Sequence, residues 1–123
     1  MEIQVLSIEN GAEVRFKCSA GVGLAIWRGD LPLVGESLDV ELDIDDSLEW
    51  TVNVSTTQDK GYKIVETDNH YILAAKVVSQ ESDVLVVDFV GNIVMLDVEC
   101  MQKDISGWVE ICAKELTLSP TNI

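Results

Sequence analysis

The sequence is poor in the residues from which most active sites are built. His70 is the only histidine among 123 residues, which excludes a metal site with two histidine ligands and an acid–base pair of histidines. Gly21 and Gly23 lack the third glycine, the Lys-Ser/Thr pair and the following helix of a phosphate-binding loop. We therefore interpret His70 as the first residue of a strand and expect no enzyme activity. An enzyme would need a pocket that joins His70 or a cysteine to several acids.

Cysteine is scarce as well. The chain has an odd number of cysteines, without the spacing of a metal site and without a Cys-x-x-Cys pair: Cys18, Cys100 and Cys112. Because all three stand among apolar neighbours, we expect buried free thiols, as in a reducing compartment. The first six residues lack the basic start and apolar core of a signal peptide, and no apolar run approaches the ~20 residues of a membrane span. These features predict a cytoplasmic protein that contacts no membrane.

Positive charge is the third shortage. The chain has 8 Lys and Arg residues against 22 Asp and Glu residues, which gives a net charge of −14 and a pI near 4.1. Such a surface repels nucleic acid and anionic membranes, so we expect no direct contact with either. It suits a cationic partner, or it serves solubility alone. With 47% hydrophobic residues the chain is nevertheless a folded protein, because disordered acidic segments are poor in Val, Ile and Leu.

What the sequence does contain is an acidic stretch, residues 36–49, with seven carboxylates and no basic residue. Within residues 37–45, four aliphatic residues alternate with four acids, and this period of two predicts a strand with one apolar and one acidic side. Acids on one side of a strand repeat every ~6.6–6.8 Å and repel one another, and a merely solvated side would carry mixed charges. We therefore predict that a partner binds this stretch, and the candidate residues are Glu36, Asp39, Glu41, Asp43, Asp45, Asp46 and Glu49.

The same stretch has part of the pattern of a metal site. The run that begins at Asp43 starts like a calcium loop, but it has Leu48 where the loop needs glycine and Val54 where it needs a bidentate glutamate. We expect neither a metal nor a cofactor. The alternative is an irregular metal site at the end of the strand, formed by Asp45, Asp46 and Glu49.

Nearly the whole chain has the alternation and the turn signals of β structure. We expect eight to ten short strands in a single β domain, residues 1–123, folded as one antiparallel barrel of OB-like type or as a sandwich. Propensity alone would allow a helix at 70–79, but the β-branched and aromatic content favours a strand. The expected strands are 3–8, 14–20, 24–28, 37–45, 50–55, 62–66, 70–79, 83–90, 93–98 and 108–118, the last with a bulge near Ala113.

The few basic residues suggest a second interpretation of the function. Arg15, Lys17 and Arg28 lie close in sequence to Phe16 and Trp27, as in the basic and aromatic surface of OB-type nucleic-acid binders. The alternative function is therefore a binding module for single-stranded nucleic acid or a small ligand.

The acids are unevenly distributed. Residues 81–104 add six acids against one base, Lys103. If this region lies beside residues 36–49, the protein carries a broad negative patch. Such a patch can cover the positive cleft with which a nuclease holds phosphate, so it predicts a nuclease inhibitor. The competing interpretation remains that the charge serves solubility only.

Two segments carry a resemblance to a known class of proteins. The runs Gly-Glu-Ser-Leu-Asp-Val-Glu-Leu-Asp-Ile-Asp-Asp-Ser-Leu-Glu-Trp at 35–50 and Gly-Trp-Val-Glu-Ile at 107–111, continued to Pro120, resemble small β-barrel immunity proteins. These proteins neutralise bacterial polymorphic toxins, including those of contact-dependent growth inhibition. The resemblance implies a cytoplasmic protein without catalysis that binds one cognate toxin domain. Together with the charge, it predicts a basic toxin nuclease domain as the partner.

Overall fold

The computed structural model describes residues 1–121, and these residues form strands and connecting segments only. None of these residues belongs to a helix, so the described chain contains no helix long and apolar enough to cross a membrane. The strands are β1 (Glu2–Glu9), β2 (Glu13–Cys18), β3 (Gly21–Trp27), β4 (Ser37–Asp43), β5 (Leu48–Glu49), β6 (Val54–Thr57), β7 (Lys63–Thr67), β8 (His70–Glu81), β9 (Val84–Phe89), β10 (Asn92–Glu99), β11 (Trp108–Ala113) and β12 (Thr117–Pro120).

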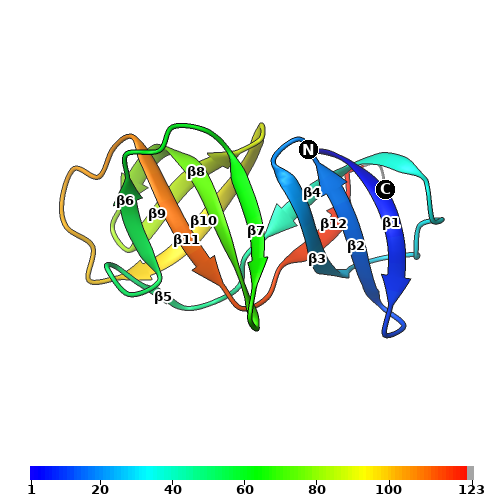
Figure 1. The fold of residues 1–123 in the computed structure, drawn as a ribbon. Coiled ribbons are helices and arrows are strands. Elements are labelled where there is room, and N and C mark those ends of the chain that lie inside the picture. Colours follow the sequence, from blue (N-terminus) through cyan, green and yellow to red (C-terminus); the bar gives the residue numbers. More distant parts are fainter. Residues whose placement is uncertain (122–123) are drawn as a thin grey trace.

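Five of the strands close into a barrel (Figure 1). Its strands pair in the order β1-β2-β3-β12-β4, and β4 pairs again with β1. All these pairs are antiparallel except β3 with β12. Numbered within the barrel, the order is 1-2-3-5-4-1, which is the connectivity of an OB-type barrel. The expectation of an all-β barrel is confirmed.

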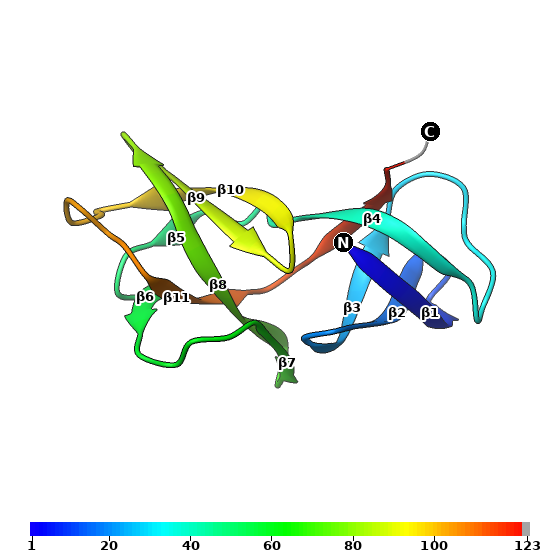
Figure 2. The same ribbon diagram turned by 90° about the horizontal axis from the view of Figure 1, so that it is seen from above.

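The other seven strands belong to one insertion between the fourth and fifth strands of the barrel. We call residues 44–116 the insert. It forms a second curved sheet beside the barrel, and the main chain passes between the two parts only at the two ends of the insert (Figures 1 and 2). Its centre is the 12-residue strand β8, which pairs with β7 and β9 along one edge and with β11 along the other. Strand β10 extends this sheet beyond β9, and β6 extends it beyond β11.

Alternating side chains fill both parts. Phe16 and Leu118 are fully buried in the barrel, and Leu73 and Leu96 are fully buried in the insert. Each such side chain stabilises the fold by about 1.5–3 kcal/mol relative to an exposed position. The buried residues of the two parts form a single cluster, so the barrel and the insert share one continuous core.

Two glycines allow the insert to approach the barrel closely. A Cβ atom on Gly21 would lie 2.5 Å from the main-chain oxygen of Ile64 in β7, and one on Gly23 would lie 2.8 Å from the Ile64 Cδ1 atom. Gly21 also has a φ of +143°, which other residues rarely adopt. Only a residue without a side chain therefore lets β3 pair with β7 at this point.

A buried asparagine joins the two parts on the other side. The Asn92 side chain in β10 accepts a hydrogen bond from the Leu42 N–H (3.3 Å) and donates one to the Leu42 carbonyl (3.0 Å). Two residues earlier, the Val40 N–H donates to the Met1 carbonyl, so β1 covers the edge of β4 only up to that point. The Asn92 amide satisfies the next pair of main-chain groups, as a neighbouring strand would.

Two of the expected strands are wrong in extent. Within the strand expected at 50–55, residues 51–53 form a turn, in which Thr51 has a φ of +69° and the Glu49 carbonyl accepts the N–H groups of Val52 and Asn53; only Val54 and Ser55 belong to a strand, β6. The expected bulge near Ala113 is instead a break, because β11 ends there and the chain crosses to the barrel before β12 begins. Alternation alone cannot detect either event.

The remaining strand predictions hold with small shifts. Residues 70–79 are a strand, as part of β8. The β9–β10 hairpin turns at Val90 and Gly91, with φ values of +52° and +80°, one residue before the expected Gly-Asn pair. The cysteine prediction is wrong at one position: Cys18 is buried and Cys112 is partly buried, but Cys100 is exposed.

Candidate functional site

The acidic strand forms as its alternation predicts. Val40 and Leu42 of β4 are buried, and so is Ile44 just beyond it, whereas Glu41 and Asp43 are exposed. Strand β4 lies between β1 and β12 in the barrel, so its inner side meets the barrel core and its outer side is on the surface. The seven candidate acids nevertheless do not act alike, because several have partners within the protein.

Asp39 is the most strongly engaged of the seven. Its carboxylate lies 2.8 Å from the Met1 amino group and accepts a hydrogen bond from the Thr121 hydroxyl at 2.9 Å. The hydrogen bond from the amino group, followed by the one from Thr121, holds the pKa of Asp39 below its usual value. A carboxylate held in this way is less available to an external cation.

Three more candidates have partners. Asp45 pairs with Arg28 at 2.8 Å, and Asp46 accepts the Lys114 main-chain N–H at 2.6 Å. Glu36 accepts the Leu33 N–H through a long contact of 3.4 Å. Asp45 and Asp46 therefore fasten the connection between β4 and β5, and neither is a free docking group.

The carboxylates of the other three candidates, Glu41, Asp43 and Glu49, form no ion pair or hydrogen bond with any residue of the described chain. Strand β10 brings two further acids to them. Glu99 is the register partner of Glu49, and Asp97 stands two residues before it on the same exposed side of β10. Their side chains also have no partner within residues 1–121.

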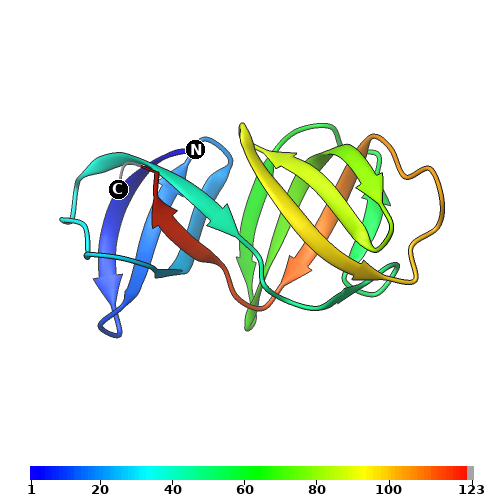
Figure 3. The same cartoon turned by 180° about the vertical axis from the view of Figure 1, so that it is seen from behind.

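We call these five residues the acidic face: Glu41, Asp43, Glu49, Asp97 and Glu99. In Figure 3 the strands that carry them, β4 and β10, lie toward the viewer on one side of the molecule. The condition set by the sequence, that the two acid-rich regions lie side by side, is therefore met at β5 and β10. Two of the five acids were missing from the candidate list, because their proximity depends on a pairing of segments 50 residues apart.

Apolar side chains stand next to these acids. Along β10 the exposed positions are Ile93, Met95, Asp97 and Glu99, and the positions between them are buried. Ile93 is 55% exposed and Met95 is 67% exposed, and the two are neighbours on the same side of β10. The sequence contains the alternation that places them outside, although the apolar composition of the hairpin obscures it.

The basic and aromatic surface of the second interpretation does not form. Trp27 is buried and its indole N–H donates to the Asp30 carbonyl at 2.8 Å. Arg15 pairs with Glu9 at 2.7 Å and Glu66 at 2.9 Å, and these bonds raise its pKa. Since Arg28 pairs with Asp45, only Lys17 of the proposed cations is left without an acidic partner in the described chain.

One pocket bears on the question whether His70 or a cysteine meets several acids, as an enzyme would require. A hollow of about 690 Å³ lies in the insert, and it is lined by Asp46, Ser47, Leu48, Asn53, Asn69, His70, Cys112 and Lys114. It does bring the histidine and one cysteine together. However, within residues 1–121 no hydrogen bond links the His70 side chain to Cys112 or to an acid, and the Asp46 carboxylate already accepts the Lys114 N–H. The nucleophile–base contact that catalysis requires is not made.

Metal binding has no support in the geometry. Among the described residues, no three His, Cys, Asp or Glu side chains gather closely enough to hold a metal ion. The alternative site at Asp45, Asp46 and Glu49 fails because two of these acids turn to Arg28 and Lys114.

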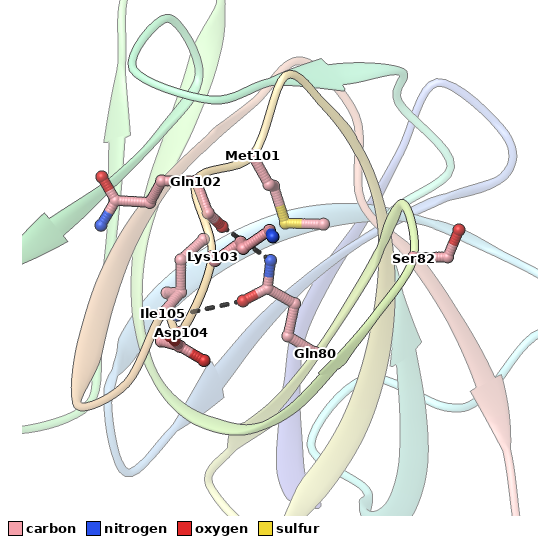
Figure 4. Close-up of a pocket in the computed structure, with 7 residues that line it drawn as sticks. All are labelled: Gln80, Ser82, Met101, Gln102, Lys103, Asp104 and Ile105. Atoms are coloured by element: carbon pink, nitrogen blue, oxygen red, sulfur yellow. Dashed lines mark hydrogen bonds between the residues drawn. The ribbon is translucent and has the colours of Figure 1, made fainter.

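A second hollow, of about 530 Å³, lies between the β8–β9 turn and the segment 101–105 (Figure 4). The Gln80 side chain spans it, donating to the Gln102 carbonyl at 2.8 Å and accepting the Ile105 N–H at 3.0 Å. Its amide is therefore used to hold the loop after β10. The charged groups at the rim are Lys103 and Asp104, of opposite sign, so the hollow has no distinct preference for a charged ligand.

Comparisons of the chain with protein-family models, with curated proteins and with solved structures find no match. The functional conclusion therefore depends on the surface itself.

Proposed function

We propose that this protein is a non-catalytic inhibitor that binds a basic protein through the acidic face. The supporting observation is that the side chains of five acids on β4, β5 and β10 have no partner within residues 1–121. Glu49 and Glu99 are register partners, and Glu41 and Asp43 flank Leu42, which the Asn92 amide joins to β10. Both arginines, in contrast, are bound by acids elsewhere. Uncompensated charge of one sign speeds encounter with a partner of opposite charge and rejects partners of like charge.

The partner that suits this face is a nuclease domain of a bacterial toxin. A nuclease needs a positive cleft to hold the phosphates of its substrate, and an acidic protein seated on that cleft blocks it without chemistry of its own. This interpretation makes the chain an immunity protein of a polymorphic toxin system, such as contact-dependent growth inhibition, that acts in the cytoplasm. It relies on charge complementarity and on the resemblance of residues 35–50 and 107–120.

The direct test compares two variants of equal charge. The face variant carries Glu41→Gln, Asp43→Asn and Glu49→Gln. The control variant neutralises three exposed acids outside the face and without a side-chain partner in the described chain, Asp59→Asn, Asp68→Asn and Glu115→Gln. Both have a net charge of −11, because each loses three of the negative charges that give −14.

The binding partner in this test is the product of the neighbouring gene, since a toxin and its inhibitor must be inherited together. We expect the face variant to associate with it about tenfold more slowly at low salt, and to inhibit it less, because interface charges mainly set the association rate. The control variant should behave as the wild type. Equal losses in the two variants would mean that the net charge, and not the acidic face, steers the partner; no loss in either would mean that the charge serves solubility only. A neighbouring product that neither binds nor is inhibited would refute the inhibitor function. Binding of a single-stranded oligonucleotide by the wild type would support the second interpretation instead.

A further inference from the structure

An apolar band crosses the outer side of the insert next to the acidic face. Val86 in β9 is the register partner of Met95 in β10 and of Ser79 in β8. Val78, the extra residue at the bulge of β8, is 56% exposed at the same level, and Ile93 stands two residues from Met95 on the same side of β10. We call Val78, Val86, Ile93 and Met95 the apolar band.

Acids border the band on the side toward the acidic face. Glu81, Val84 and Asp97 are register partners across β8, β9 and β10, and neither Glu81 nor Asp97 has a side-chain partner within residues 1–121. At the opposite border the Asp88 carboxylate is occupied by the Tyr62 hydroxyl and the Gly91 N–H. Free acids therefore lie at the Asp97 end of the band, where β10 continues to Glu99 and its register partner Glu49.

The negative charge of the protein determines which kind of partner can bind the apolar band. A second copy of the chain would bring a further −14 to the same contact, and an anionic membrane would be repelled in the same way. A cationic protein segment meets no such repulsion. Large apolar side chains surrounded by charged ones are also the usual arrangement of a protein interface, with an apolar centre and a polar rim.

We propose that the apolar band is the anchor for a cationic amphipathic segment of a partner protein. Apolar side chains of that segment cover Met95 and Ile93, while its Lys and Arg side chains reach Asp97 and Glu99. The proposal rests on the proposed function and adds to it the class of side chains that the partner must present. The acids then govern how fast the partner arrives, and the band governs how long it stays.

The three methionines make the band visible to NMR. Met95 is 67% exposed, whereas Met1 and Met101 are partly buried against the core. The full chain is labelled with ¹³C at the methionine methyl groups and titrated with an eight-residue peptide of alternating Lys and Leu. One control peptide replaces Leu by Ser, and a second replaces Lys by Glu. We expect the Lys–Leu peptide to move the Met95 signal more than those of Met1 and Met101, and both controls to bind at least tenfold more weakly.

Matched variants locate the anchor. Ile93→Ser with Met95→Ser removes two exposed side chains of the band that are neighbours on β10, and Leu33→Ser with Val65→Ser removes two exposed apolar side chains elsewhere. We expect the first pair to weaken binding of the Lys–Leu peptide at least tenfold and the second pair less than twofold. No binding of this peptide, equal losses in the two pairs, or equal binding of the Lys–Ser peptide would overturn the proposal.

The result separates this proposal from the inhibitor function. We call the variant with Ile93→Ser and Met95→Ser the band variant. If the face variant weakens binding of the neighbouring gene's product but the band variant does not, the inhibitor function stands and the anchor fails. If the band variant loses the peptide while the neighbouring product does not bind at all, the band is a docking surface and the proposed toxin is wrong.

Discussion

Asn92 offers the sharpest test of how the two parts of this protein are held together. Its side chain is 7% exposed, and its amide forms both hydrogen bonds with the main chain of Leu42. Asn92→Ala removes both bonds and leaves a buried N–H and a buried carbonyl without partners. Each unsatisfied group costs about 1–3 kcal/mol, so we expect the free energy of unfolding to fall by about 2–5 kcal/mol. Typical domains have only about 5–15 kcal/mol in total.

The measurement is urea unfolding followed by tryptophan fluorescence. Asn53→Ala is the matched control: the Asn53 side chain accepts the Glu49 N–H at 3.1 Å, but this bond is exposed and water can replace it. We expect it to cost less than about 1 kcal/mol. Equal costs for the two variants would show that the Asn92 amide does not hold β10 to β4.

Asn92→Asp separates the two bonds by pH. An aspartate has the same shape and can accept the Leu42 N–H, but when ionised it cannot donate to the Leu42 carbonyl. Burial and the facing carbonyl raise the folded-state pKa of this aspartate above its unfolded value of about 3.9. The deficit relative to the wild type is therefore largest at neutral pH and shrinks as pH falls through the raised pKa. A deficit that is constant between pH 7 and pH 4 would contradict this account.

A glycine, a tyrosine and a cysteine give the remaining predictions. Gly21→Ala should cost about 2–5 kcal/mol of unfolding free energy, from overpacking and positive φ, whereas Gly11→Ala meets no atom within 4 Å and should cost about 1 kcal/mol. The hydrogen bond to Asp88 raises the pKa of Tyr62. This pair therefore stabilises the fold fully below about pH 10, and its contribution falls as Tyr62 ionises at higher pH. Asp88→Asn should shift the titration of Tyr62, followed by absorbance at 295 nm, to lower pH. Cys100 should react fastest of the three thiols with a disulfide reagent, because it is the exposed one.

The sequence predicts well what is local. The acidic strand, the Asn10–Gly11 turn and the long strand β8 follow from alternation and turn chemistry within a few residues. The same reasoning fails at 50–55, where Trp50 and Val54 are buried but Val52 between them is 67% exposed. The residues have the period of a strand, yet hydrogen bonds to the Glu49 carbonyl close the chain into a turn.

What is not local could not be predicted. Asp46 is bound by Lys114, 68 residues away, and Asp39 by Thr121, 82 residues away, so composition alone cannot tell an engaged acid from a free one. Strands β4 and β12 lie on either side of the long insertion in the sequence, yet they pair with each other in the barrel. Alternation indicates which side of a strand is buried, but it does not indicate which strand lies beside it.

The insert gives a structural reason for the proposed binding of a cationic partner in place of nucleic acid. Such barrels usually bind on the side of their second and third strands, but in this protein β7 pairs with β3 and Glu66 neutralises Arg15 there. On the opposite side, the Asn92 amide fixes the start of β10 against β4, two strands that carry unpartnered acids. If this reasoning holds, Asn92→Ala should weaken binding of the cationic peptide even at temperatures where the variant remains folded. Unchanged affinity in the folded variant would mean that each strand carries its acids independently.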